Sequence, residues 1–163
     1  MRIREATPDD VELIERLIRG LAEYERLLDQ VTLDTEGLRR SLFGERRFAE
    51  VLIAEDDREA TGFALYFHNF STFLGKPGIY LEDLFVLPER RGRGIGKALL
   101  QRLAQIAVER DCGRLEWAVL NWNTDAIGFY QRLGARPNSE WTTYRLTGEP
   151  LRELAELSRQ TAS

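Results

Sequence analysis

The chain has 163 residues, of which 43% are hydrophobic and 31% charged. That length favours a single domain, and the composition is that of a globular protein rather than a disordered one. A net charge of −4 weighs against a nucleic-acid partner, and a single cysteine excludes a disulfide within the chain and a cysteine-based metal cluster. There is no apolar signal core, and no apolar run approaches the ~20 residues that cross a bilayer, so we expect a cytoplasmic protein with no membrane partner.

Strand and helix patterns alternate along the chain. Thr7 is a candidate helix cap with Pro8 in the first turn, and the apolar residues that follow keep helical spacing up to Ala22. A later helix begins after Asn123, also a natural cap, and ends at Gly134. The expected strands cover 1–6, 48–54, 62–67, 78–87, 115–120 and 142–146, and the expected helices cover 7–22, 34–43, 95–109, 123–133 and a loose tail from 151.

Three of these strands follow one another without a helix between them, whereas 78–87, 95–109 and 115–120 form a strand–helix–strand unit. This order predicts an α/β (α+β) fold with a mixed sheet, which has antiparallel hairpins at one end and a parallel crossover at the other. We expect one domain over 1–163, with its core at about 3–154 and a C-terminal tail over 155–163.

The segment RRGRGIG lies between an expected strand and an expected helix, which is the arrangement of an anion site. Glycines allow backbone N–H groups to approach a ligand, the helix start adds partial positive charge, and arginines suit phosphate. A Walker loop is excluded because Ala98, not serine or threonine, follows Lys97, and a dinucleotide fold would carry its loop after the first strand. A pyrophosphate-bearing ligand fits better; the alternative is a flexible, basic surface turn.

The stretch from Arg91 to Gly96 fits the Gln/Arg-x-x-Gly-x-Gly/Ala signature of the GCN5-related N-acetyltransferases (GNAT). With IYLEDLFVLPERRGRGIG, AVLNWNTDAIGFYQRLGA and LAEYERLLDQV, the chain resembles the spermidine/spermine (diamine) and thialysine acetyltransferase branch from Ile3 to about Leu154. The resemblance implies a GNAT fold with a mixed central sheet of about six to seven strands flanked by helices. It also implies acetyl-CoA as cosubstrate, no metal, a small-molecule amine as substrate and a homodimer.

By this resemblance, one group of residues contacts acetyl-CoA: Leu84, Phe85, Val86, Arg91, Gly92, Arg93, Gly94, Ile95, Gly96, Lys97, Asn123 and Arg132. The strand before the loop pairs with the pantetheine arm through its backbone, and the loop holds the pyrophosphate. For Arg132, a solvated helix arginine is an equally good interpretation.

Acetyl transfer to an amine needs a proton acceptor, because an ammonium with a pKa near 10 does not attack. Glu82 and Asp83 interrupt an apolar strand, and strand alternation turns one of them inward unless the strand bulges. The residues alone allow two interpretations. Glu82 and Asp83 are either surface acids on an edge strand or in salt bridges, or one of them is a carboxylate in a cleft that attracts a cationic amine. The resemblance assigns Glu82 as the base and Asp83 as a partner for the substrate charge.

Tyr130 alone would be a packing tyrosine on its helix, but the resemblance makes it the general acid that protonates the leaving thiolate. The implied substrate-side residues are Tyr24, Glu25, Glu82, Asp83, Glu116, Trp117 and Glu140. Each acid taken singly is more often a surface charge, although together they suit a polycation. Phe73 stands where the polyamine enzymes tend to have tryptophan, which weakens the case for spermine.

Three functions therefore compete. The first is acetyl-CoA-dependent acetylation of a diamine, a polyamine or a thialysine-like amino acid. The second is acetylation of a protein lysine or N-terminus, and the third is acetyl-CoA sensing without turnover. The presence of both Glu82 and Tyr130 favours an enzyme over the sensor.

Overall fold

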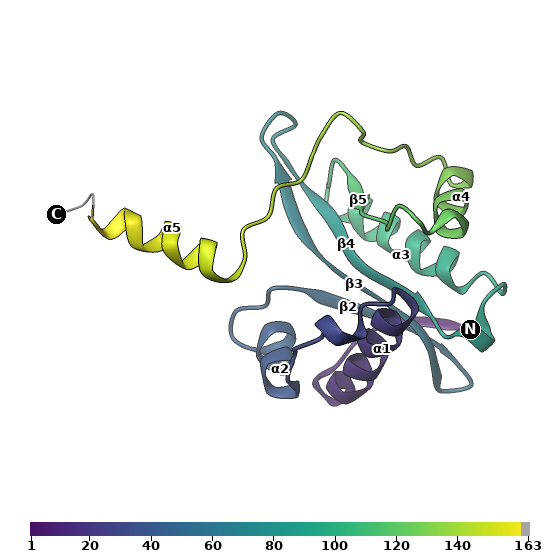
Figure 1. The fold of residues 1–163 in the computed structure, drawn as a ribbon. Helices are drawn as coiled ribbons and strands as arrows, with labels where there is room; N and C mark the ends of the chain where they lie inside the picture. The colour runs from purple at the N-terminus through teal and green to yellow at the C-terminus, as the bar shows by residue number, and fades with distance from the viewer. Residues whose placement is uncertain (161–163) are drawn as a thin grey trace. The chain divides into compact units, whose positions relative to one another are not determined.

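The computed structural model describes residues 1–160, with side chains up to 157, and its elements follow the expected order (Figure 1). The described residues form strands β1 (Arg2–Glu5), β2 (Glu50–Asp56), β3 (Glu59–Ser71), β4 (Lys76–Val86) and β5 (Leu115–Trp117). The α-helices are α1 (Val11–Tyr24), α2 (Thr35–Phe43), α3 (Ile95–Glu109), α4 (Thr124–Arg132) and α5 (Gly148–Gln160). Short 3₁₀ turns are η1 (Pro8–Asp10), η2 (Leu28–Gln30) and η3 (Pro88–Arg90). The chain divides into two compact units, residues 1–120 and residues from 121 onward.

The sheet of the first unit is mixed, as expected. Its order is β1-β2-β3-β4-β5, with β1 to β4 antiparallel and β5 parallel to β4. The helix between β4 and β5 is α3, so the expected strand–helix–strand crossover is confirmed. The expected strand count was too high, because within the described part of the chain residues 142–146 run as coil with no neighbouring strand to complete a ladder.

Helices cover both faces of this sheet (Figure 1). One face packs against α1 and α2 through a buried cluster that consists of Ile14, Leu17, Leu21, Leu42, Val51, Ile53, Phe63 and Phe85. The buried side of α3 supplies Ile95, Leu99, Leu100, Leu103, Ile106 and Ala107 for the other face. A Cβ on Gly20 of α1 would lie 2.9 Å from the Phe85 ring, so glycine permits the close approach of α1 to β4.

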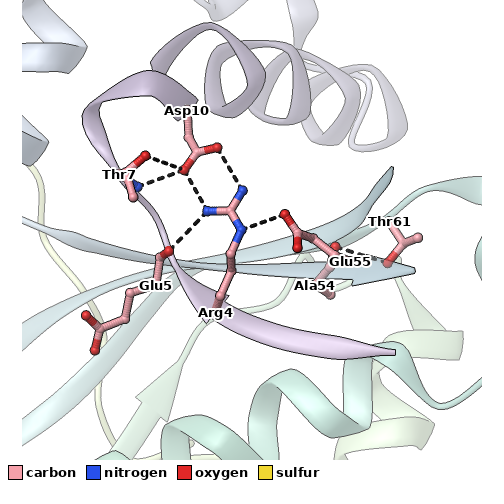
Figure 2. A network of polar contacts seen from close by, with 7 residues as sticks. All are labelled: Arg4, Glu5, Thr7, Asp10, Ala54, Glu55 and Thr61. Carbon is pink, nitrogen blue, oxygen red and sulfur yellow. Dashed lines mark hydrogen bonds and ion pairs between the residues drawn. The ribbon is translucent and has the colours of Figure 1, made fainter. Parts of the chain in front are cut away.

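An ion-pair network ties β1 to β2 and to the start of α1 (Figure 2). The Arg4 guanidinium donates two hydrogen bonds to the Asp10 carboxylate, at 2.7 and 2.9 Å, and its Nε donates to Glu55 at 2.5 Å. Asp10 also accepts from the backbone N–H of Thr7 at 2.7 Å. The hydrogen bonds from Arg4 are the main reason why the pKa of Asp10 falls to about 2.

Strand β4 contains a β-bulge at Glu82. Leu65 of β3 pairs with Asp83 and the next residue, Tyr66, pairs with Leu81, so Glu82 has no residue opposite it. Asp83 consequently shares a face with Leu65 and the α1 core, whereas Leu81 lies on the α3 face.

The same bulge marks the end of the parallel pair. β5 pairs with Ile79 to Leu81 and stops at Trp117, three residues earlier than expected. Bulges bend and twist a strand and interrupt its ladder, which accounts for the shortened β5.

The second unit contains α4 and α5. Asn123 caps α4 as expected, because its Oδ1 accepts a hydrogen bond from the backbone N–H of Ala126 at 3.3 Å. Three leucines recur every third residue along α5, and all are exposed: Leu151, Leu154 and Leu157. The expected tail helix is therefore present as far as it is described, and residues 161–163 lie outside the described chain. None of the described helices combines the length and the apolar content that a membrane span requires.

Candidate active site

Three carboxylates gather where α1 ends beside the β4 bulge. Glu25 follows the last residue of α1, and its pKa is raised by burial and by the charge of Glu82. Burial, then the charges of Glu82 and Glu25, raises the pKa of Asp83 to about 7. Glu82 itself is exposed. The structure thus brings together three of the predicted substrate-side acids, in a position that favours a cation.

The end of β4 offers an open backbone edge beside these acids. The N–H of Leu87 donates to the carbonyl of Thr61 at 2.9 Å, so Leu87 and Phe85 belong to the hydrogen-bonded pairs with β3. Leu84 and Val86 alternate with them and direct their N–H and C=O groups away from β3. No described strand pairs with that edge, since β5 stops at the bulge. An extended amide-bearing ligand could add to this edge as a strand would.

The glycine–arginine loop leads from this edge into α3. Gly92 and Gly94 have φ angles of +76° and +79°, which side chains other than glycine rarely adopt. Gly94 occupies the N-cap position of α3 but has no side chain that could accept a hydrogen bond. The first backbone N–H groups of the helix therefore face the loop without a side-chain acceptor. Arg93 and Lys97 are exposed beside them. Backbone donors and two cations at a helix start suit an anion, and binding of an anion by this loop stays a prediction.

Arg91 turns back from the loop toward α1. Its Nε donates to the carbonyl of Val86 at 2.9 Å, and its Cζ lies 4.5 Å from the centre of the Tyr24 ring. The same guanidinium lies 5.5 Å from the Phe85 ring. Sequence patterns did not indicate this contact, because nothing local links Arg91 to a tyrosine so far away in the chain.

Glu116 lies on β5 and has polar partners on β3 and directly before β5. It pairs with Tyr80 in the sheet, accepts a hydrogen bond from Asn69 at 3.3 Å, and lies 3.6 Å from the guanidinium of Arg114. Trp117 pairs with Leu81 and therefore belongs to the α3 face. A substrate-side role for Glu116 and Trp117 stays a prediction.

The remaining predicted site residues belong to the second unit. Tyr130 lies on α4 with its ring 5.5 Å from that of Phe129, and Arg132 is the last residue of the helix. The cap Asn123 is only 9% exposed. Glu140 is exposed in a turn. Across the described residues, no group of three or more His, Cys, Asp or Glu side chains has a geometry that could hold a metal ion.

Comparisons with known proteins relate most of the chain to proteins of named activity. The sequence model of the acetyltransferase (GNAT) family matches residues 14–135. A thialysine N-epsilon-acetyltransferase of Sus scrofa is 43% identical, with 94% of this chain and 96% of the relative covered. An L-ornithine N5-acetyltransferase of Arabidopsis thaliana is 34% identical, with 96% and 89% covered. Among solved structures, an integron cassette protein from the mobile metagenome of V. cholerae is 29% identical, with a TM-score of 0.80 and 95% and 97% covered.

Proposed function

Because this chain belongs to the acetyltransferase (GNAT) family and is an N-acetyltransferase, we propose that it moves the acetyl group of acetyl-CoA to a primary amine of a small cationic substrate. The substrate class is a diamine, a polyamine or an amino acid with a side-chain amine, such as thialysine. The observation that carries this proposal is the position of Glu25, Glu82 and Asp83 directly beside the open edge of β4.

The proposed division of labour rests on these positions for Glu82 and the β4 edge, and on the resemblance to the family for Tyr130. Acetyl-CoA would supply a thioester, held by the backbone groups of Leu84, by the N–H of Val86 and by the loop before α3, whereas the carbonyl of Val86 accepts from Arg91. Glu82 is the proposed base because the bulge exposes its carboxylate at the end of the paired segment, where it can accept a proton directly or through water. Tyr130 is the proposed acid, since a phenol can return a proton to the leaving thiolate.

The relatives favour an amino acid as the amine. Two of them are named for thialysine and L-ornithine, both of which carry a side-chain amine. A third relative, from Homo sapiens, is named a spermidine/spermine N(1)-acetyltransferase-like protein. It is 35% identical to this chain, and the matched region covers 24% of the length of that human protein. We therefore rank amino acids above polyamines, in agreement with Phe73 in place of the expected tryptophan.

We further propose that the two units form one N-acetyltransferase domain, since the family match crosses from the first into the second. Homodimer formation is supported by the exposed leucines of α5 and by the exposed rings of Trp141 and Tyr144, which a second copy could bury. The cytoplasmic location stays a prediction from the sequence.

The test is release of CoA thiol from acetyl-CoA across thialysine, ornithine, lysine, putrescine, spermidine, spermine and a lysine-containing peptide. Preferred turnover of one small amine supports the proposal and names its class. Turnover of the peptide alone would replace it with protein acetylation. Binding of acetyl-CoA without turnover on any amine would favour the sensor.

A further inference from the structure

We propose that Arg91 is a positioning residue for the amine: it holds Tyr24, and with it the end of α1 that carries Glu25, against β4. The inference rests on the proposed function, because it gives Arg91 a role on the amine side of that site. In the resemblance to the family this arginine belongs instead to the loop that contacts the cosubstrate.

The first support is the anchor on β4. The Nε of Arg91 donates to the carbonyl of Val86, which is an outward-facing group of the open edge. This hydrogen bond fixes the guanidinium plane at the end of the strand, just before the loop. The side chain therefore points back toward the sheet and not forward to the start of α3.

The second support is the stacking on α1. The guanidinium lies 4.5 Å from the Tyr24 ring centre and 5.5 Å from that of Phe85, so its flat cation bridges a helix residue and a strand residue. One turn earlier, Gly20 of α1 lies against the same Phe85 ring. The helix is thus fixed to β4 at two successive turns, and the second attachment directly precedes Glu25.

The third support is the division of charges in the loop. Arg93 and Lys97 are exposed at the start of α3, where an anion would bind, whereas Arg91 is engaged with Val86, Tyr24 and Phe85. A lysine at position 91 would keep the positive charge. It would lose the planar guanidinium, which stacks on the Tyr24 ring and at the same time donates a hydrogen bond to the Val86 carbonyl. The R91K variant should therefore still attract an anion by its charge, but it should no longer hold Tyr24 in place.

Kinetics and binding of R91K form the first test. We expect the KM for the preferred amine to rise about two- to fivefold, the range for an exposed cation–π contact of roughly 0.5–1 kcal/mol. The Kd for acetyl-CoA, measured by calorimetry without an amine, should stay within about twofold because the charge is kept. In a Y24L background R91K should add no further increase in KM, because the partner ring is already gone.

Hydrogen exchange of the unliganded protein is the second test and needs no turnover. The N–H of Glu25 bonds to the carbonyl of Leu21 at 2.9 Å, and R91K should accelerate exchange in this last turn of α1 several-fold. The matched control is R102K, since Arg102 lies on α3 and pairs with Glu109 of the same helix at 3.0 Å. R102K should leave both the exchange and the amine KM unchanged.

Two results would overturn the inference. One is a rise in the acetyl-CoA Kd of R91K with an unchanged amine KM, which assigns Arg91 to the cosubstrate. The other is unchanged exchange at the end of α1. If the wild type turned over no amine, the proposed function would fail, while the exchange experiment would still decide the role of Arg91.

Discussion

The carboxylate of Glu25, at the end of α1, and that of Glu82, on the β4 bulge, repel each other closely enough for the charge of Glu82 to raise the pKa of Glu25. Both charges also act on Asp83. Like charges held together in a folded protein store repulsion that a bound cation can relieve. The first two predictions follow from this arrangement.

Replacing Asp83 with asparagine should stabilise the protein at neutral pH. The pKa of Asp83 is about 7 in the fold and 3.8 in a model peptide, so its protonated form is favoured by folding. The contribution of Asp83 to the free energy of unfolding is fully present below about pH 4, and it is lost as the pH rises to about 7. Urea midpoints of D83N and wild type should therefore agree near pH 4 and diverge in favour of D83N by pH 8. An equal midpoint at pH 8 would contradict the burial of this carboxylate.

The change E82Q should lower the amine kcat/KM by about 10²-fold at neutral pH, the lower end for loss of a general base. The deficit should shrink at high pH, where more of the amine is already deprotonated. The same change should lower the pKa of Asp83, because it removes a neighbouring charge. E89Q, the same substitution on an exposed residue of η3, is the matched control and should retain full activity. An equal deficit at every pH would assign Glu82 to binding rather than to proton transfer.

Y130F should slow turnover by about 10²-fold and leave the calorimetric Kd for acetyl-CoA within about twofold of wild type. Phenylalanine keeps the ring beside Phe129, so the packing of α4 should persist and the effect should fall on kcat. Wild-type turnover by Y130F would remove the phenol from the mechanism.

G94V should raise the acetyl-CoA KM and also destabilise the protein by about 1–2 kcal/mol, because valine at a φ of +79° is strained. G75V provides the matched control, since Gly75 lies in the β3–β4 hairpin with a φ of +63°. It should be destabilised to a similar degree with an unchanged KM. A KM that rises equally in both variants would point to general loss of structure.

D10N should reduce the free energy of unfolding at pH 7 by about 2 kcal/mol, because it removes one of the two carboxylates that pair with the Arg4 guanidinium. The pKa of Asp10 is lowered, so its contribution is present above its ordinary value of 3.8 and is lost as pH falls toward about 2. The difference in urea midpoint between D10N and wild type should accordingly shrink below pH 3.8 and vanish below about pH 2. D9N, a change in the exposed neighbouring residue, should have a small effect throughout.

Local patterns accounted for most of the fold. Apolar periodicity and caps located the five α-helices of the described residues, including the cap Asn123 of α4, and the alternation of elements predicted the mixed sheet. The glycine loop could be interpreted because left-handed φ angles have a strong residue preference. These features depend on neighbours in the chain.

Features set by distant partners were harder to predict. In a regular strand, Leu81 and Phe85 would lie on the same face of the sheet, because they are four residues apart. The bulge at Glu82 lies between them, so the Leu81 side chain faces α3 and the Phe85 side chain faces α1. The sequence raised a bulge as one way to keep both acids out of the core, yet its position depends on the register with β3. The contact of Arg91 with Tyr24 likewise arises only when α1 is packed on β4.

Glu82 has no residue opposite it on β3, so the pairing between β3 and β4 does not depend on it. Deleting it would leave Leu81 opposite Tyr66 and Asp83 opposite Leu65, so both hydrophobic layers would keep their side chains. A straight β4 could then extend its pairing with β5 beyond Leu81 and cover the backbone edge that Leu84 and Val86 leave open. One inserted amino acid thus separates a sheet with a paired β4 edge from one with an open edge, and the same amino acid carries the exposed carboxylate beside that edge.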